Sequence, residues 1–177
     1  MALNFTFQEE HFNRIFPFYI LINQQVVVES TGKTMEKLFP GTANKNFFDS
    51  YKIKRPALKE TDFESLKSLS SQLLVLECLN EKQINLRGQI DFLPETNQLI
   101  FLGSPWLSSI EEVIENKLTL HDFAFHDSMT DLLHVMKTQE NANEDLKFLL
   151  KTVNRQKDEL KNANNPETID RIKAARQ

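Results

Sequence analysis

The sequence predicts an α+β fold, in which an antiparallel sheet with flanking helices is followed by one long helix. Two distributions along the chain indicate this division. All four glycines and five of the six prolines precede residue 106, and neither type occurs from Trp106 to Asn165. Thirteen of the fourteen phenylalanines precede residue 126. A body rich in turns and aromatic side chains is therefore expected before a tail that lacks helix-breaking residues.

The first expected element is an N-terminal helical segment, residues 1–16. Phe12, Ile15 and Phe16 stand at helical spacing behind two acidic residues, which favour a helix N-terminus. Pro17 then starts a different structure. The β-rich runs 18–22 and 26–28 predict a hairpin of two strands.

The middle of the body is predicted to be helical. Residues 33–39 indicate a short helix that Pro40 and Gly41 close, and residues 46–51 indicate a further helical turn. Extended chain is expected at Arg55, because a residue before proline is disfavoured in the helical region.

Three more strands are expected after this middle part, over residues 73–79, 84–92 and 99–102. In the second run, apolar and polar residues alternate, so that one face is buried and the other faces water. The third run is more apolar and should be more central. Two strands, a helical middle and three strands favour an antiparallel sheet, and a five-stranded PAS-like sheet fits this order.

Beyond Trp106 the chain is predicted to be helical. Ser108 or Ser109 is placed to cap a short helix through Ile114, and Asp127 or Ser128 to cap a long one. From Asp127 onward, steps of four and three residues select a coiled-coil seam with polar interruptions at Gln139, Asn143 and Lys157. The predicted dimer interface consists of Leu132, Met136, Gln139, Asn143, Leu146, Leu150, Val153 and Leu160.

This long helix needs a partner for its apolar stripe. Residues 127–162 would span about 54 Å at 1.5 Å per residue. A parallel helix from a second copy of the chain is the economical partner, and the polar seam positions would fix the register. The alternative is a helix that folds back on its own sheet. Asn164 to Pro166 then break the pattern, so that residues 164–177 form a linker or begin a further helix.

Composition excludes several classes of protein. The body has enough apolar and aromatic residues for a core, and no apolar run reaches the length of a membrane helix. No secretory signal is visible, and the lone Cys78 has no disulfide partner, so a reducing cytoplasm is expected. The net charge of −4 argues against a nucleic-acid surface.

Five short motifs, in order, resemble one family. They are the segments 86–90, 93–95, 100–105, 118–122 and 126–127, which read LRGQI, LPE, IFLGSP, LTLHD and HD. The segments 16–18 and 53–56 fit the same pattern. Together they resemble the PAS-like, haem-nitric-oxide-binding-associated domain of soluble guanylate cyclases and related bacterial sensor histidine kinases.

The resemblance implies a regulatory module that dimerises. It would pass a signal from an upstream haem-based gas-sensing domain, through a coiled coil, to a downstream kinase or cyclase domain. The haem belongs to a separate domain in that family, so no cofactor is expected here. No kinase or cyclase signature is present, and this chain is expected to be non-enzymatic. The expected domains are 1–16, a PAS-like domain over 17–125, a signalling helix over 126–163, and 164–177.

Few residues suggest chemistry of their own. His121 and His126 lie beside acidic residues, but a helical metal pair needs a spacing of four, and the alternative is that His126 marks the entry to the long helix. Arg87 and Gln89 would bind an anionic ligand or contact a neighbouring domain; the preferred alternative is that Arg87 pairs with an acid on the neighbouring strand. Arg55 would anchor a loop by a salt bridge. We expect no catalytic, cofactor or metal residues.

Trp106 and Cys78 are expected to have structural roles, and two alternative functions are considered. Trp106 is expected to pack between sheet and tail, and Cys78 to be a small core residue. The main rival function is a PAS-type small-molecule sensor, in which the phenylalanines line a ligand pocket; a filled core is the preferred interpretation. A scaffold without a signalling role is a weaker possibility.

Overall fold

The computed structural model describes residues 8–80, 84–163 and Ala174. Contacts divide the chain into two compact units, one ending at Leu133 and one beginning at His134. The long helix α6 (Ser128–Ala163) belongs to both, since its first turns are part of the first unit. The predicted boundary between 125 and 126 stays a prediction.

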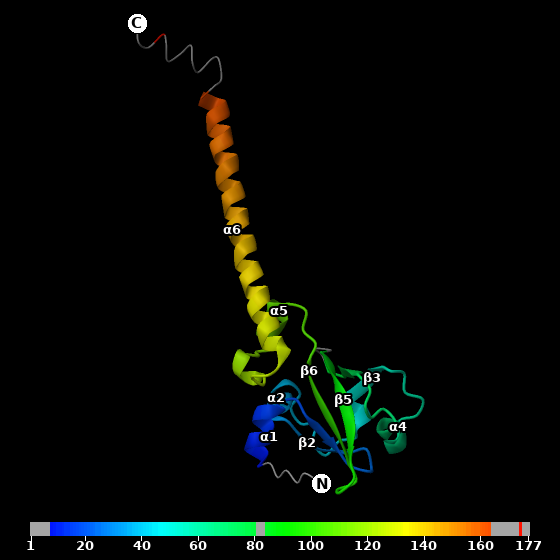
Figure 1. Cartoon of the computed structure of the whole chain (residues 1–177). Helices are drawn as coiled ribbons and strands as arrows, with labels where there is room; N and C mark the ends of the chain where they lie inside the picture. Colours follow the sequence, from blue (N-terminus) through cyan, green and yellow to red (C-terminus); the bar gives the residue numbers. More distant parts are fainter. Residues whose placement is uncertain (1–7, 81–83, 164–173, 175–177) are drawn as a thin grey trace. The chain divides into compact units, whose positions relative to one another are not determined.

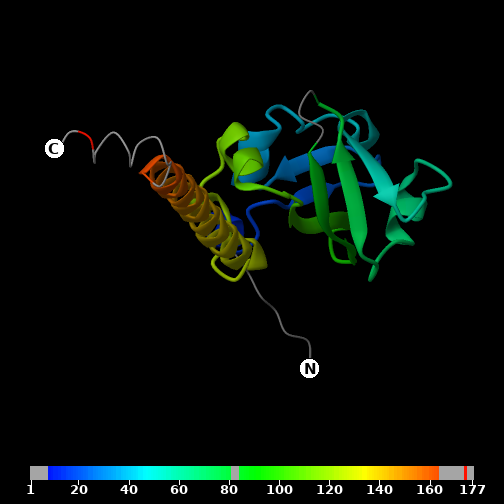
Figure 2. The same cartoon turned by 90° about the horizontal axis from the view of Figure 1, so that it is seen from above.

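The first unit is built on one antiparallel sheet, as the sequence predicts (Figures 1 and 2). Its strands lie in the order β2-β1-β6-β5-β4-β3. Their bounds are β1 (Ile20–Ile22), β2 (Val28–Thr31), β3 (Tyr51–Arg55), β4 (Leu74–Cys78), β5 (Asn85–Leu93) and β6 (Gln98–Pro105). The apolar strand β6 pairs with β1 and β5 and is central, which confirms the expectation from its composition.

The sheet of the described residues has six strands, so the predicted count of five is wrong. The additional strand is β3, which pairs with β4 at the edge of the sheet. Its Tyr51 and Ile53 are buried, whereas Lys52 and Lys54 are exposed. Alternation over so few residues is a weak signal, and exposed lysines are typical of edge strands. The strand ends at Arg55, which precedes Pro56 through a cis peptide bond.

The predicted short helices are confirmed over the described residues, and one α-helix was missed. Their bounds are α1 (Glu9–Ile15), α2 (Lys33–Leu38), α3 (Phe47–Ser50) and α5 (Ile110–Glu115). Residues 1–7 of the expected N-terminal segment 1–16 lie outside the described residues. Ser109 caps α5, because its hydroxyl accepts a hydrogen bond from the Glu112 N–H. The additional helix is α4 (Phe63–Lys67), which begins behind the cap Asp62. The residues before this cap carry no apolar periodicity that would have announced a helix.

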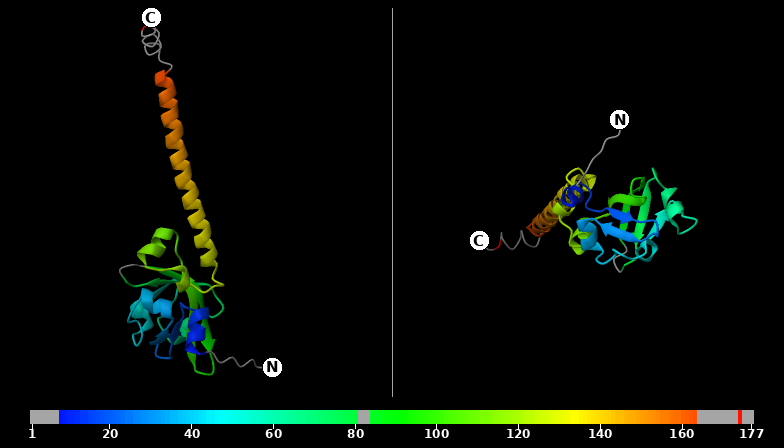
Figure 3. Two further views of the ribbon diagram at one scale, coloured as in Figure 1. Left: turned by 90° about the vertical axis from the view of Figure 1, so that its left-hand side faces the viewer. Right: turned by 90° about the horizontal axis from the view of Figure 1, so that it is seen from below.

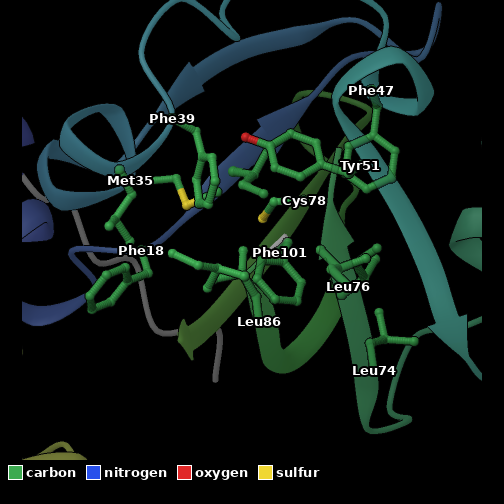
Figure 4. Packing of buried hydrophobic residues seen from close by; sticks show 14 of the residues in the cluster. Phe18, Met35, Phe39, Phe47, Tyr51, Leu74, Leu76, Cys78, Leu86 and Phe101 are labelled. Atoms are coloured by element: carbon green, nitrogen blue, oxygen red, sulfur yellow. The ribbon is translucent and has the colours of Figure 1, made fainter. Parts of the chain in front are cut away.

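The hydrophobic core lies between one face of the sheet and the short helices. Met35 and Leu38 of α2, Phe47 of α3 and Leu66 of α4 are almost fully buried. Figure 4 shows aromatic side chains gathered with Leu86 and Cys78 in this interior. The predicted filled core is therefore observed in the described body, where many large side chains, among them Phe18, Phe47, Tyr51 and Phe101, are less than 2% exposed.

Two glycines make room for one of these core side chains. Gly88 of β5 and Gly103 of β6 are cross-strand partners. A Cβ atom on either would come within 2.7 Å of the Phe101 ring, and within 2.7 Å of backbone on the facing strand. The Phe101 ring packs against this glycine pair, which explains why the alternating pattern of β5 is interrupted by Gly88.

The second unit contains the remainder of α6, which runs without interruption (Figure 3). The expected helix is thus confirmed in position and length. Residues 164–177, expected to be a linker or a new helix, lie outside the described residues except for Ala174. Among the described residues, no helix is long and apolar enough to span a membrane.

Candidate functional site

The most connected polar group of the body lies immediately before α6. We define the junction as Ser104, Thr119, Asp122 and Asp127, together with Thr34 and Lys37 of α2. All of these residues belong to the first unit. They join the end of the central strand β6, a core helix and the first turn of the helix that leaves the body.

Asp122 connects Thr119 to helix α2 within the junction. In the short 3-10 helix Leu120–Asp122, its Oδ2 accepts hydrogen bonds from Thr119 N at 2.7 Å and from Thr119 Oγ1 at 2.9 Å. The same oxygen lies 2.7 Å from Lys37 Nζ. Thr34 Oγ1 donates to the Asp122 carbonyl at 2.9 Å. Helix α2 therefore holds this segment at both backbone and side chain.

The negative charge of Asp122 is stabilised by its hydrogen-bond donors. Burial by itself would raise the pKa of this carboxyl, but the hydrogen bonds from Lys37 and Thr119 outweigh burial and lower it. The Asp122 side chain is only 16% exposed, whereas that of Lys37 is 41% exposed. The ion pair is thus partly screened by water, and its stabilising effect is modest.

Asp127 connects the sheet to α6. Its Oδ1 accepts a hydrogen bond from Met129 N at 3.0 Å, which makes it the N-cap of the helix. Its Oδ2 accepts a hydrogen bond from the Ser104 hydroxyl at the end of β6. Of the two predicted caps, Asp127 is the residue observed. One carboxylate therefore bonds to both the central strand and the departing helix.

Aromatic contacts hold the chain on either side of this carboxylate. The rings of Phe18 and Phe123 lie 5.5 Å apart, and those of Phe16 and His126 lie 6.2 Å apart. Leu133, in the second turn of α6, is 7% exposed and belongs to the core cluster. The first turns of α6 are thereby part of the rigid body.

The predicted seam residues lie along α6. The exposed fractions of the leucine and valine side chains range from 44% at Leu132 to 64% at Leu160, with Leu146, Leu150 and Val153 between. Gln139 and Asn143 are also exposed, and Met136 is partly buried. The part of α6 in the second unit thus carries an exposed apolar stripe.

His121, Arg87 and Arg55 were the other residues considered for a chemical role. His121 lies in the 3-10 helix, and no three His, Cys, Asp or Glu side chains of the described residues are grouped to hold a metal. Arg87 forms no ion pair with its neighbouring strands, so the salt bridge expected there is wrong, and Arg55 forms none among the described residues, so its expected loop-anchoring salt bridge stays a prediction. Lys54 instead pairs with Glu77 of β4 at 2.9 Å.

Cys78 is buried in the core as expected, whereas Trp106 is more exposed than expected. Cys78 is 1% exposed, and burial raises the pKa of its thiol, which makes it an unreactive core residue. Trp106 is 54% exposed, so its expected packing between sheet and tail is at best partial.

Sequence reasoning missed most of the junction. Ser104 and Asp122 stood inside motifs used for the resemblance, but without assigned roles. The spacing Thr119-x-x-Asp122 is a capping-box signal and could have been recognised. Nothing in the sequence links Lys37 to Asp122, which is 85 positions away.

Comparisons with known proteins agree with this architecture. The family model described as "Heme NO binding associated" matches residues 5–83 and 78–173. Rat guanylate cyclase soluble subunit beta-2 is 29% identical over 177 positions, covering 94% of this chain and 25% of that protein. Rat subunit alpha-2 is 29% identical over 145 positions, covering 77% and 20%.

A nematode relative extends the same pattern. The soluble guanylate cyclase gcy-31 of Caenorhabditis elegans is 25% identical over 193 positions, covering 92% of this chain and 26% of that protein. The chain thus spans a fifth to a quarter of the length of these relatives. Since the family model matches nearly the whole sequence, the chain belongs to the haem-NO-binding-associated family of guanylate-cyclase-like proteins.

Proposed function

We propose that this domain is a non-catalytic regulatory module that dimerises through α6 as a parallel coiled coil. It would receive a signal from an upstream haem-based gas-sensing domain or protein and pass it to a downstream output domain. The observation that carries the proposal is the long exposed apolar stripe on a helix whose cap is hydrogen-bonded to the central strand of the body.

The pattern of polar seam residues supports a two-stranded parallel arrangement. The alternating steps put Met136, Asn143, Leu150 and Lys157 at heptad position a, with the other seam residues at position d. A polar Asn or Lys at an a position lowers stability but specifies register and oligomeric state. Asn143 and Lys157 are thus the kind of interruption that a dimeric signalling helix would use.

The junction supports the relay part of the proposal. A displacement of β6 would act on Ser104, hence on the Asp127 carboxylate and the first turn of α6. Lys37 and Thr34 offer a second route from the core helix α2 through Asp122. A signal that changes packing in the body therefore has two polar connections to the segment that begins the helix.

The output domain is proposed from the relatives. Their names describe guanylate cyclases, and this favours a cyclase as the downstream domain over a histidine kinase. The word "soluble" in those names favours the cytoplasm as the location. The partner helix is proposed to come from a second copy of this chain.

Sedimentation equilibrium tests the dimer. We expect a mass near twice the 20.6 kDa of one chain at tens of micromolar. The double substitution Leu146→Asp and Leu150→Asp should yield a monomer, because it buries unpaired charge in the seam. Phe148→Asp is the matched control: Phe148 is 70% exposed on the opposite face of α6, so its replacement should leave the dimer intact. A monomeric parent chain, or equal effects of both variants, would refute the proposal.

The rival function is a body that binds its own small ligand. What favours it is that the hydroxyls of Tyr51 and Thr42 lie buried close to each other, and among the described residues neither has a well-aligned hydrogen bond. A ligand could satisfy such groups. Against it stands the dense packing around Tyr51, which is 1% exposed. A melting temperature that rises with an added metabolite would favour this rival.

A further inference from the structure

A second polar site lies away from the junction. A hollow of about 580 Å³ lies between the start of β5, the loop that follows β6, and helix α5. We call it the tryptophan hollow and define it by Asn85, Trp106, Ser108, Glu112, Glu115 and Asn116. All of these residues belong to the first unit, and none takes part in the relay proposed above.

An exposed indole ring forms one wall of the hollow. Trp106 is 54% exposed, although tryptophan has a large apolar surface that usually becomes buried. Its backbone N–H donates to the Asn85 carbonyl at 2.8 Å, which fixes the loop against β5. The face of an indole ring attracts cations more strongly than other aromatic rings do.

The rest of the lining offers hydrogen-bond acceptors. Glu112 accepts from Ser108 N at 2.8 Å and from Ser108 Oγ at 2.6 Å, and these bonds lower the pKa of its carboxyl. The carboxylate is thereby oriented and kept negative. Glu115 stands nearly one turn further along α5 and is exposed.

We infer that the tryptophan hollow binds the arginine side chain of a partner protein. A guanidinium group is planar, so it can stack on an indole ring while its N–H groups donate to carboxylates in the same plane. The lining residues that the structure describes carry two carboxylates and no Lys or Arg, which makes this part of the hollow complementary to a cation. Its volume lies in the range of ligand sites and leaves room for the residues next to the arginine.

The fluorescence of the chain's single tryptophan reports directly on this site. The probe is the blocked tripeptide Gly-Arg-Gly, and its counterpart contains citrulline, which keeps the shape but lacks the charge. We expect saturable quenching by the arginine peptide and at least fivefold weaker binding of the citrulline peptide. Agmatine, a free guanidinium compound, should also bind at least fivefold more weakly than the peptide, because it lacks the flanking backbone.

Two substitutions separate a defined site from general charge attraction. Glu115→Gln should weaken the arginine peptide at least fivefold, since it removes a negative charge from the lining without touching the core. Glu95→Gln removes an exposed carboxylate in the turn between β5 and β6 and should change nothing. Equal binding of both peptides, or equal losses in both variants, would overturn the inference. Agmatine binding as tightly as the peptide would overturn the assignment to a protein partner.

Discussion

Asp122 shows how one residue can join two elements that are distant in sequence. Its carboxylate accepts hydrogen bonds from Thr119 and from Lys37 of α2, and its carbonyl accepts one from Thr34. Most of its side chain is shielded from water. Loss of the charge would leave Lys37 without its ion-pair partner, whereas a neutral side chain with an oxygen atom could still accept the hydrogen bonds from Thr119.

We predict a pH-dependent effect of Asp122→Asn. The folded-state pKa of Asp122 lies below its ordinary value of 3.8, so its charge stabilises the fold above that pH. The variant should be about 1 kcal/mol less stable at pH 7, a figure that allows for the partial exposure of Lys37. This difference should shrink as the pH falls below 3.8 and vanish below the folded-state pKa. Urea unfolding at a series of pH values measures it.

A matched control is available on α6. Asp145 is exposed and forms no hydrogen bond or ion pair among the described residues. Asp145→Asn should leave the stability unchanged at every pH. A loss in Asp122→Asn that stays constant down to pH 2 would show that the charge of Asp122 has no part in the effect.

At the scale of elements, the first turn of α6 depends on its cap. Asp127→Ala should lower the free energy of unfolding by about 1–2 kcal/mol, since both the Met129 N–H and the Ser104 hydroxyl lose their acceptor. Asp127→Asn should cost much less, because asparagine caps a helix about as well as aspartate. Thermal and urea unfolding of the two variants give the comparison. Equal stability of the alanine variant and the parent would exclude a capping role.

The elements that the sequence predicted correctly are those with a strong local signal. The alternation in β5 indicated one buried face, and the apolar run in β6 indicated a central strand. Pro and Gly residues marked where short helices end. Strand β3 escaped because its five residues include three charged ones. The helix α4 escaped because its surroundings gave no periodicity. In both cases the structure is stabilised by neighbours that lie far away in the sequence.

The candidate site was predictable only in part, for the same reason. The seam on α6 follows from spacing within one helix, and the cap Asp127 follows from its position before that helix. The contacts of Lys37 with Asp122 and of Ser104 with Asp127 depend on how α2 and β6 are placed by the folded sheet. The exposed Trp106 was expected to pack, because its type alone argues for burial.

At the scale of the whole molecule, the chain consists of a folded body and a long helix whose exposed apolar stripe needs a partner. The body is a PAS-like sheet with a filled core, and the chain belongs to the haem-NO-binding-associated family. We propose that the junction passes strain from strand β6 and helix α2 to α6. The central claim is that two copies of α6 lie side by side in parallel.

A distance between spin labels, measured by double electron–electron resonance, tests that claim most directly. A spin label at Lys161→Cys stands near the end of α6 and beside the seam. Cys78 needs no replacement, because it is 1% exposed and burial raises the pKa of its thiol, so the parent chain should take up no label. A parallel dimer places the two labels about 20 Å apart, given the 8–10 Å between packed helix axes. A distance of about 45 Å, as expected for an antiparallel pair centred on Leu146, or no dipolar coupling at all, would contradict the account.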